Sequence, residues 1–232
     1  MSTETAHAFL ALMLDAPLMS FGHSSRFQRR TTALHPTRSA LLGMVCAAAG
    51  ADKGSAAEAA WLERLGEAAV AVSVLAIPRQ PAGSRQPVPV LRLEDYHTVL
   101  DTRRASGAIS KDAVVSHRQY LLDARFGVIL AGPRATLDAV AAALRNPQWG
   151  IWFGRKSCIP AAPVVRGLAS SQPKALRMLD PDGRAIEEFD TVTDAATFAD
   201  GTDTLMDAPV SFATRQFRPR RIAARPREAS SG

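Results

Sequence analysis

AFLALML, at residues 8–14, is a short run in which every residue is apolar, and it ends where Asp15 and Pro17 follow. Such a run is typical of a β-strand that is buried on both faces of a sheet. It therefore predicts the first strand of the fold, and the elements after it decide what kind of sheet it joins.

Two helix starts follow this strand. Thr37 is expected to cap a helix whose apolar stripe ends at Gly50. Ser55 and Glu58 then form the capping-box pattern of a second helix, which is expected to run to about Ala68.

The next strands and one more helix complete a known order of elements. Residues 70–77 (VAVSVLAI) predict a second strand because they are apolar and rich in β-branched side chains. A third strand is expected at about residues 120–131, then a helix at about 136–144, and a last strand near Ile151 or Val164. This order predicts an α+β fold with a ferredoxin-like (RRM-like) βαββαβ domain, a pattern used by RNA-recognition modules.

The expected domain boundaries follow from composition. The ferredoxin-like domain spans residues 7–168 and carries a long insertion at about 78–119, which is far longer than a hairpin loop of about 2 to 5 residues. We interpret the insertion as a protruding arm, with a solvated loop as the alternative. A small β-rich section is expected at 169–217, and an arginine-rich, flexible tail at 218–232.

The charge balance points to a polyanionic partner without proving one. The formal net charge is +6, but 24 of the 28 basic residues are Arg, and a GC-rich genome produces such a composition whatever the function. The placement of the arginines is more informative. Residues 16–51 contain no acidic side chain yet carry Arg26, Arg29, Arg30 and Arg38.

Several classes of protein are disfavoured. Cys46 and Cys158 are far apart and lack paired spacing, so we expect no disulfide, metal site or cofactor. No basic leader is followed by an apolar core, and no apolar run approaches the roughly 20 residues that span a bilayer. A cytoplasmic protein with no membrane partner is expected.

Two turns are candidate phosphate sites. In PTRSALLG, at residues 36–43, Arg38 falls in the first turn of the helix, where a cation faces the positive end of the helix dipole and an anion would remove the conflict. An exposed, solvated arginine is the alternative. GRKSC, at residues 154–158, combines a glycine turn with two cations but lacks the spacing of a nucleotide-binding P-loop.

A catalytic alternative stays open. His117, Lys111 and Tyr120 are residue types that serve metal-independent RNA cleavage, with His as acid or base and Lys stabilising the developing charge.

Four motifs, taken in order, resemble the fifth family of CRISPR-associated proteins in its type I-E form. They are PTRSALLG at residues 36–43, DYHTVL at 95–100, YLLD at 120–123 and GRKSC at 154–158. The resemblance runs from the first strand to about Gly167. It implies a β-hairpin thumb within the insertion and a small C-terminal β section.

The resemblance also implies a function. Such proteins hold the 5′ handle of CRISPR RNA and cap the CasC backbone of the Cascade complex near its large subunit, CasA. They meet target DNA only indirectly, through the complex, in defence against foreign DNA. In type I-E a separate endonuclease cleaves the precursor RNA, which favours a non-catalytic subunit, whereas type I-C relatives cleave RNA themselves. The expected RNA-binding residues are Arg26, Arg29, Arg30, Thr37, Arg38, Ser39, Tyr96, His97, Arg103, Arg104, Arg118, Tyr120, Gly154, Arg155, Lys156 and Ser157.

Overall fold

A computed structural model describes residues 6–22, 28–79, 88, 90–103, 106–109 and 112–227. Its helices are α1 (Arg38–Ala48), α2 (Ala56–Arg64), α3 (Arg134–Arg145), α4 (Gln172–Leu179) and the short 3-10 helix η1 (Ile186–Glu188). Its strands are β1 (His7–Asp15), β2 (Leu18–Met19), β3 (Arg29–Arg30), β4 (Ala71–Ala76), β5 (Leu91–Val99), β6 (Val114–Leu122), β7 (Arg125–Pro133), β8 (Val165–Ala169), β9 (Thr191–Asp194), β10 (Asp203–Ser211) and β11 (Gln216–Arg225).

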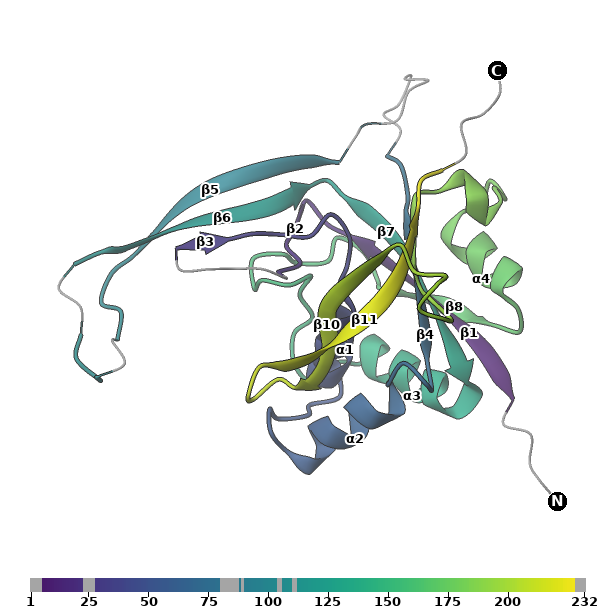
Figure 1. Ribbon diagram of the computed structural model, residues 1–232, viewed down its shortest axis with the longest axis horizontal. Coiled ribbons are helices and arrows are strands. Elements are labelled where there is room, and N and C mark those ends of the chain that lie inside the picture. Colours follow the sequence, from purple (N-terminus) through teal and green to yellow (C-terminus); the bar gives the residue numbers. More distant parts are fainter. Residues whose placement is uncertain are drawn as a thin grey trace.

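The main sheet has the strand order β10-β11-β9-β4-β7-β1-β8, and all of its pairings are antiparallel. The α+β class predicted from the sequence is therefore confirmed. The strand predicted from AFLALML is β1, which lies between β7 and β8 in the interior of the sheet (Figure 1).

The core explains why β1 is apolar at every position. Leu10, Leu12 and Leu14 belong to the larger hydrophobic cluster, which also contains residues of α1 and α3. Ala11 and Met13 belong to a second cluster with residues of α4. Because successive side chains of a strand point to opposite faces, β1 contributes to a core on each side of the sheet.

The expected helices are confirmed with small shifts. The Thr37 side chain accepts a hydrogen bond from the Ala40 backbone N–H, as a cap of α1 should. The Ser55 side chain caps α2 by accepting from the Glu58 N–H, but the Glu58 carboxylate accepts from the Gly54 N–H instead of completing the box at Ser55. Helix α2 ends at Arg64, earlier than expected.

The expected third strand is wrong in one respect. The chain turns at Asp123, whose φ is +47°, and this turn divides the segment into β6 and β7. Aspartate adopts this left-handed conformation more readily than most residues. Because the residues on either side of Asp123 are apolar, the sequence pattern predicted one continuous strand here and no turn.

Strands β5 and β6 form a long antiparallel hairpin that projects from the body of the molecule (Figure 1). They belong to a second sheet, in which β6 also pairs with β2 and β3.

The C-terminal region does not form a separate unit. Strand β9 pairs with β4, so β9, β10 and β11 extend the main sheet. The prediction of a flexible tail from residue 218 is wrong for residues 218–225, because they belong to β11. The last residue of this strand, Arg225, pairs with Thr191 of β9. Residues 228–232 lie outside the described part of the chain. Helix α4 was not expected.

Candidate nucleic-acid interface

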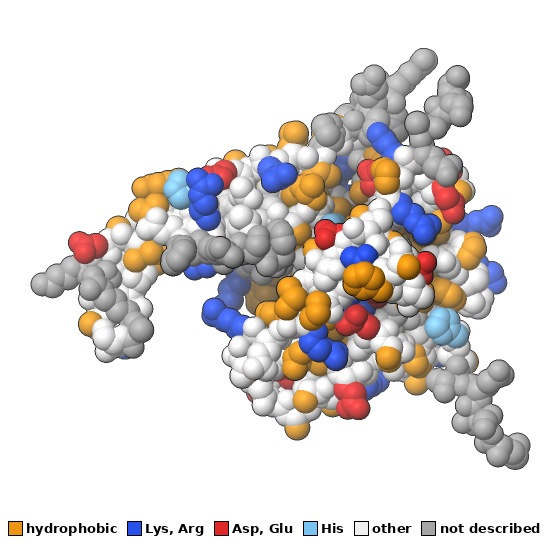
Figure 2. Space-filling model, in the orientation of Figure 1, with side chains coloured by type: hydrophobic (Ala, Val, Ile, Leu, Met, Phe, Trp, Pro, Cys, Tyr) orange, Lys and Arg blue, Asp and Glu red, His pale blue; other side chains and the backbone are white. Residues whose placement is uncertain are grey.

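A hollow of about 680 Å³ lies where the β5–β6 hairpin meets β2 and the turn at residues 154–157. We call it the basic groove, and its lining is Leu18, Leu93, Asp95, His97, Arg118, Tyr120, Arg155, Lys156 and Ser157. In Figure 2, basic side chains lie along the hairpin and in the concave angle between it and the body.

The hairpin register decides which side chains enter the groove. Asp95 is opposite Arg118, and Leu93 is opposite Tyr120. Directly opposed residues share a face, and the faces alternate along each strand. His97, two residues beyond Asp95, therefore faces the groove as well.

Arg155 ties the turn to the hairpin. Its guanidinium lies 4.6 Å from the centre of the Tyr120 ring. Its Nη1 donates to the carbonyl of Gln119 at 3.0 Å, and its Nη2 donates to the carbonyl of Arg30 at 2.9 Å. Tyr120 is only 6% exposed, so it supports Arg155 from below and offers little surface for a base to stack on.

Gly154 allows the turn to approach the body closely. Its φ is +98°, and a Cβ at this position would lie 1.7 Å from the carbonyl oxygen of Ser20. The Ser20 N–H donates to the Phe153 carbonyl at 3.0 Å, next to this contact. The turn therefore needs glycine, and it places Lys156 and Ser157 in exposed positions.

Strand β3 adds positive charge beside the groove. It runs parallel to β6, with Arg29 next to His117 and Arg30 next to Arg118. Both arginines are exposed. Arg30 and the cations of the groove thus gather around one acidic lining residue, Asp95, and such a concentration of like charge favours binding of a polyanion.

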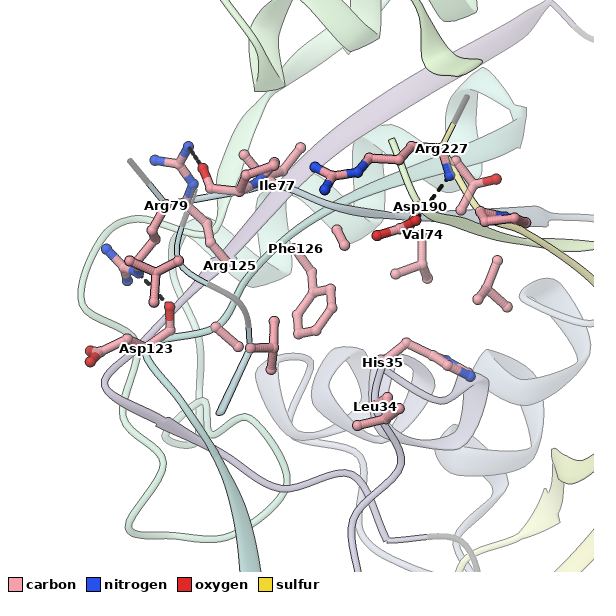
Figure 3. Close-up of a pocket in the computed structure, with 18 of the residues that line it drawn as sticks. Leu34, His35, Val74, Ile77, Arg79, Asp123, Arg125, Phe126, Asp190 and Arg227 are labelled. Atoms are coloured by element: carbon pink, nitrogen blue, oxygen red, sulfur yellow. Dashed lines mark hydrogen bonds between the residues drawn. The ribbon is translucent and has the colours of Figure 1, made fainter. Parts of the chain in front are cut away.

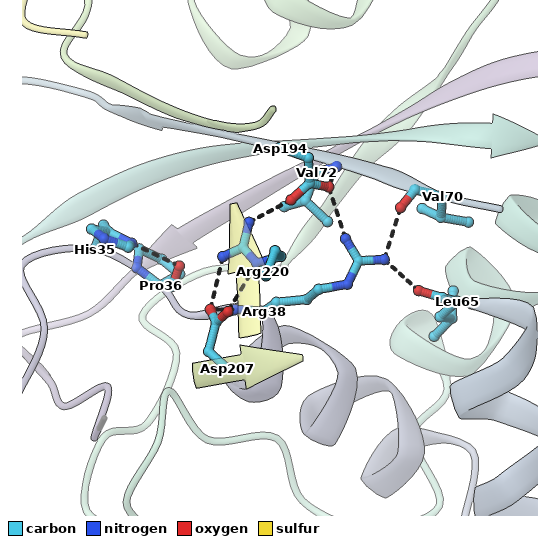
Figure 4. Close-up of polar contacts among 9 residues, drawn as sticks. All are labelled: His35, Pro36, Arg38, Leu65, Val70, Val72, Asp194, Asp207 and Arg220. Carbon is cyan, nitrogen blue, oxygen red and sulfur yellow. Dashed lines mark hydrogen bonds and ion pairs between the residues drawn. The ribbon is translucent and has the colours of Figure 1, made fainter. Parts of the chain in front are cut away.

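The prediction that Arg38 binds phosphate is wrong, because its side chain is buried and already paired. Arg38 is 1% exposed. Its Nη1 forms an ion pair with Asp194 at 2.8 Å, and its Nη2 donates to the carbonyls of Leu65 and Val70 (Figure 4). The anion expected at the start of α1 is the carboxylate of Asp207, which accepts from the Arg38 backbone N–H.

The neighbours of Arg38 in the motif are also engaged locally. Thr37 is 1% exposed and caps α1. The hydroxyl of Ser39 lies 3.1 Å from the Thr37 hydroxyl. Both positions therefore have structural contacts of their own. Sequence reasoning missed the carboxylates of Asp194 and Asp207, because nothing local links them to α1.

Tyr96 and His117 occupy the other face of the hairpin. They are opposed in the register, and their rings meet edge to face with centroids 5.5 Å apart. The His117 Nδ1 lies 3.2 Å from the Glu94 carboxylate. Tyr96 is 64% exposed, so it remains a candidate for stacking, although outside the groove.

The two described members of the candidate catalytic trio, His117 and Tyr120, do not lie together. His117 and Tyr120 are three positions apart on β6 and point to opposite faces. Arg103 is exposed beyond the end of β5. Lys111, Arg26 and Arg104 lie outside the described residues.

The described residues hold neither a metal-site cluster nor a helix that could span a membrane. No group of three or more His, Cys, Asp or Glu side chains within them has the arrangement of a metal site. No helix within them has both the length and the apolar character needed to cross a membrane.

Comparisons with known proteins agree with each other. The family model described as CRISPR-associated protein (Cas_Cas5) matches residues 9–225. The CRISPR system Cascade subunit CasD of Escherichia coli (strain K12) is 30% identical over 217 residues, which cover 90% of this chain and 94% of that protein.

Two solved structures share the fold of this chain. A chain of a CRISPR RNA-guided surveillance complex superposes with a TM-score of 0.73 at 27% identity, covering 95% of this chain and 90% of that one. A second structure, titled "Crystal structure of Cas protein", shares the fold with a TM-score of 0.60 at 24% identity, covering 94% of this chain and 95% of that one. The chain therefore belongs to the Cas_Cas5 family of CRISPR-associated proteins.

Proposed function

We propose that this protein is a subunit of a Cascade surveillance complex and binds CRISPR RNA in the basic groove. The observation that carries the proposal is the convergence of Arg118, Arg155 and Lys156 in one hollow beside the exposed Arg30. The relationship to CasD and to a chain of an RNA-guided surveillance complex supplies the ligand class.

The groove suits single-stranded RNA. Its cations come from strand β6 and from the turn at residues 154–157. His97 offers a ring within the groove, and Tyr96 offers one on the outer face of the hairpin. Phosphate contacts combined with aromatic stacking are the usual means of binding unpaired RNA. We assign the groove to the 5′ handle of CRISPR RNA.

The proposed domain organisation follows the same reasoning. Strands β1, β4, β7 and β8 lie side by side in the order β4-β7-β1-β8, which supports a ferredoxin-like arrangement over residues 7–168. The β5–β6 hairpin is then the thumb. The protein would cap the CasC backbone near CasA and meet target DNA only through the complex.

We assign no catalytic role to this subunit. The opposite orientations of His117 and Tyr120 on β6 disfavour the ribonuclease alternative. Cleavage of repeat RNA that persists in a chelator and disappears in His117→Ala would overturn this assignment.

The groove is tested by the double variant Arg155→Ala with Lys156→Ala. We expect affinity for handle RNA to fall and the slope of log affinity against log salt to flatten by about 1.4, because each phosphate contact on a single strand contributes about 0.7. The matched control is Lys174→Ala with Arg177→Ala, which removes the same two charges from exposed positions on α4. Equal behaviour of the two double variants would place the RNA elsewhere.

A further inference from the structure

A second and larger hollow, of about 960 Å³, lies at the foot of the hairpin. We call it the foot cavity. It is lined by the ends of β4 and β11, the starts of β5, β7 and β9, and the turn between β6 and β7. Figure 3 shows Arg79, Asp123 and Arg125 together on one side of it, and Asp190 with Arg227 on another. Nothing in the proposed RNA groove uses these residues.

The walls of the foot cavity are aliphatic and open to solvent. Leu34 is 54% exposed, Leu91 is 51% exposed, and Val88 and Val90 are each 41% exposed. Two aromatic rings line the cavity in the described part of the chain: Phe126, which is 1% exposed and closes the floor, and the half-buried imidazole of His35. Clustered exposed aliphatic side chains of this kind mark a surface that another molecule covers.

The rim of the foot cavity carries charges of both signs with an excess of arginine. Its arginines are Arg79, Arg125, Arg225 and Arg227, and its carboxylates are Asp123 and Asp190. Arg79 is already paired with Asp15.

Arg125 has unused hydrogen-bonding capacity. Its Nη2 donates one long bond of 3.4 Å to the Pro78 carbonyl. Its Nε is enclosed and has no partner among the described residues. Because the Nε is enclosed, a carboxylate that enters from solvent would pair with the Nη groups, and a carboxylate is the group that satisfies a guanidinium best.

The two hollows lie on the same face of the hairpin and differ in chemistry. The basic groove has a ring at His97 and an arginine stacked on Tyr120, whereas the walls of the foot cavity are mainly aliphatic, with one half-buried imidazole at His35. Unpaired RNA needs faces for its bases, and two carboxylates at the rim would repel its phosphates. An apolar side chain flanked by carboxylates fits both the aliphatic walls and the excess of arginine.

We propose that the foot cavity docks a segment of a neighbouring protein subunit, with an apolar side chain inserted between Leu34 and Leu91 and an adjacent Asp or Glu paired with Arg125. The inference rests on the proposed function, since the neighbour is another protein of the same complex. It adds a protein-binding site to a subunit whose RNA groove lies further along the hairpin.

The test uses the whole complex, assembled on its RNA, with a photo-crosslinking amino acid in place of Leu34. We expect a crosslink to a peptide of another subunit that has an apolar residue next to Asp or Glu. Matched complexes carry the same group at Met206, which is 58% exposed on β10 and does not line the cavity. A crosslink to RNA, or no crosslink above the Met206 level, overturns the proposal.

A second measurement covers the charged contact. Arg125→Glu should weaken joining of the subunit to the complex by about tenfold or more, as expected when a central interface charge is reversed, and leave RNA affinity of the isolated chain unchanged. Unchanged joining would overturn the carboxylate contact. Loss of RNA binding in Arg155→Ala with Lys156→Ala is a separate result, so failure of the docking site and failure of the RNA groove can be told apart.

Discussion

The carboxylate of Asp207 accepts a hydrogen bond of 2.8 Å from the backbone N–H of Arg38, although the two residues are 169 positions apart in the chain. Arg38 begins α1, so Asp207 places a negative charge at the positive end of this helix. Arg220 donates to both carboxylate oxygens of Asp207 and also pairs with Asp194, which pairs in turn with Arg38 (Figure 4). This network joins the β10–β11 hairpin to the first helix.

The network changes the acidity of Asp207. Burial by itself would raise the pKa of the Asp207 carboxyl. Hydrogen bonds from Arg220 and from the Arg38 backbone, together with the charge of Arg220, outweigh this effect, so the net pKa is below its ordinary value of 3.8. Burial alone would favour the neutral form. The charged form is therefore the one that the fold stabilises.

Removing this carboxylate should destabilise the protein strongly. Asp207→Ala leaves the start of α1 without its carboxylate and leaves two buried arginines, Arg38 and Arg220, to share Asp194, so we expect the free energy of unfolding to fall by about 3 to 5 kcal/mol. Urea denaturation measures it. Asp203→Ala, at an exposed position of the same strand, should cost far less. Similar losses for both variants would contradict the role of the network.

Arg38 should matter for stability and not for RNA affinity. Because its side chain is buried and paired, Arg38→Met should lower the midpoint of unfolding but leave the salt dependence of RNA binding unchanged. Lys156→Ala should do the reverse, with the slope flattening by about 0.7. Binding titrations at several salt concentrations, made below the unfolding transition, distinguish the two. A flatter salt dependence of RNA binding for Arg38→Met would show that Arg38 does contact RNA.

Stability should decrease in acid through Asp207. Since its folded-state pKa is lowered, its contribution is present above the ordinary value of 3.8 and is lost as the pH falls through the lower folded-state value. Asp207→Asn should reduce the slope of unfolding free energy against pH below about pH 4, by up to about 1.4 kcal/mol per pH unit. Parallel curves for wild type and variant would refute this. Asp203→Asn is the control.

The Gly154 turn should not tolerate a side chain. Gly154→Ala introduces a left-handed alanine and a clash with the Ser20 carbonyl, for an expected cost of about 3 kcal/mol and weaker RNA binding as Arg155 and Lys156 move. Gly183→Ala is a matched control, because Gly183 has a φ of +76° but open space around it. It should cost about 1 kcal/mol and leave RNA binding intact. Equal costs would show that the close approach to Ser20 is unimportant.

Local patterns predicted several elements correctly. The apolar run of β1 and the capping residues Thr37 and Ser55 act within a few residues of themselves, so their effect can be read from neighbouring positions. The turn at Asp123 was missed because the residues beside it are as apolar as a strand interior. Helix α4 was missed in a region that composition alone describes as β-rich.

The candidate site was partly predictable. The glycine turn with Arg155 and Lys156 could be recognised, because a glycine and adjacent cations are a local signal. Which hairpin residues face the groove could not be predicted, since this depends on the register of β5 and β6. Register places His97, Arg118 and Tyr120 on one face and Tyr96 with His117 on the other.

By itself the sequence determined the class of fold, most of the helices and strands, and a surplus of arginine that favours a polyanionic partner. Only the tertiary structure decided which arginines are available to bind one. Arg38 and Arg220 look as free in the sequence as Arg155 does, but carboxylates from β9 and β10 reach them and hold them in the core. The physical reason is that a buried charge needs a partner: the pairing of β10 with β11 brings Asp207 to Arg220, and long-range packing brings both carboxylates to Arg38.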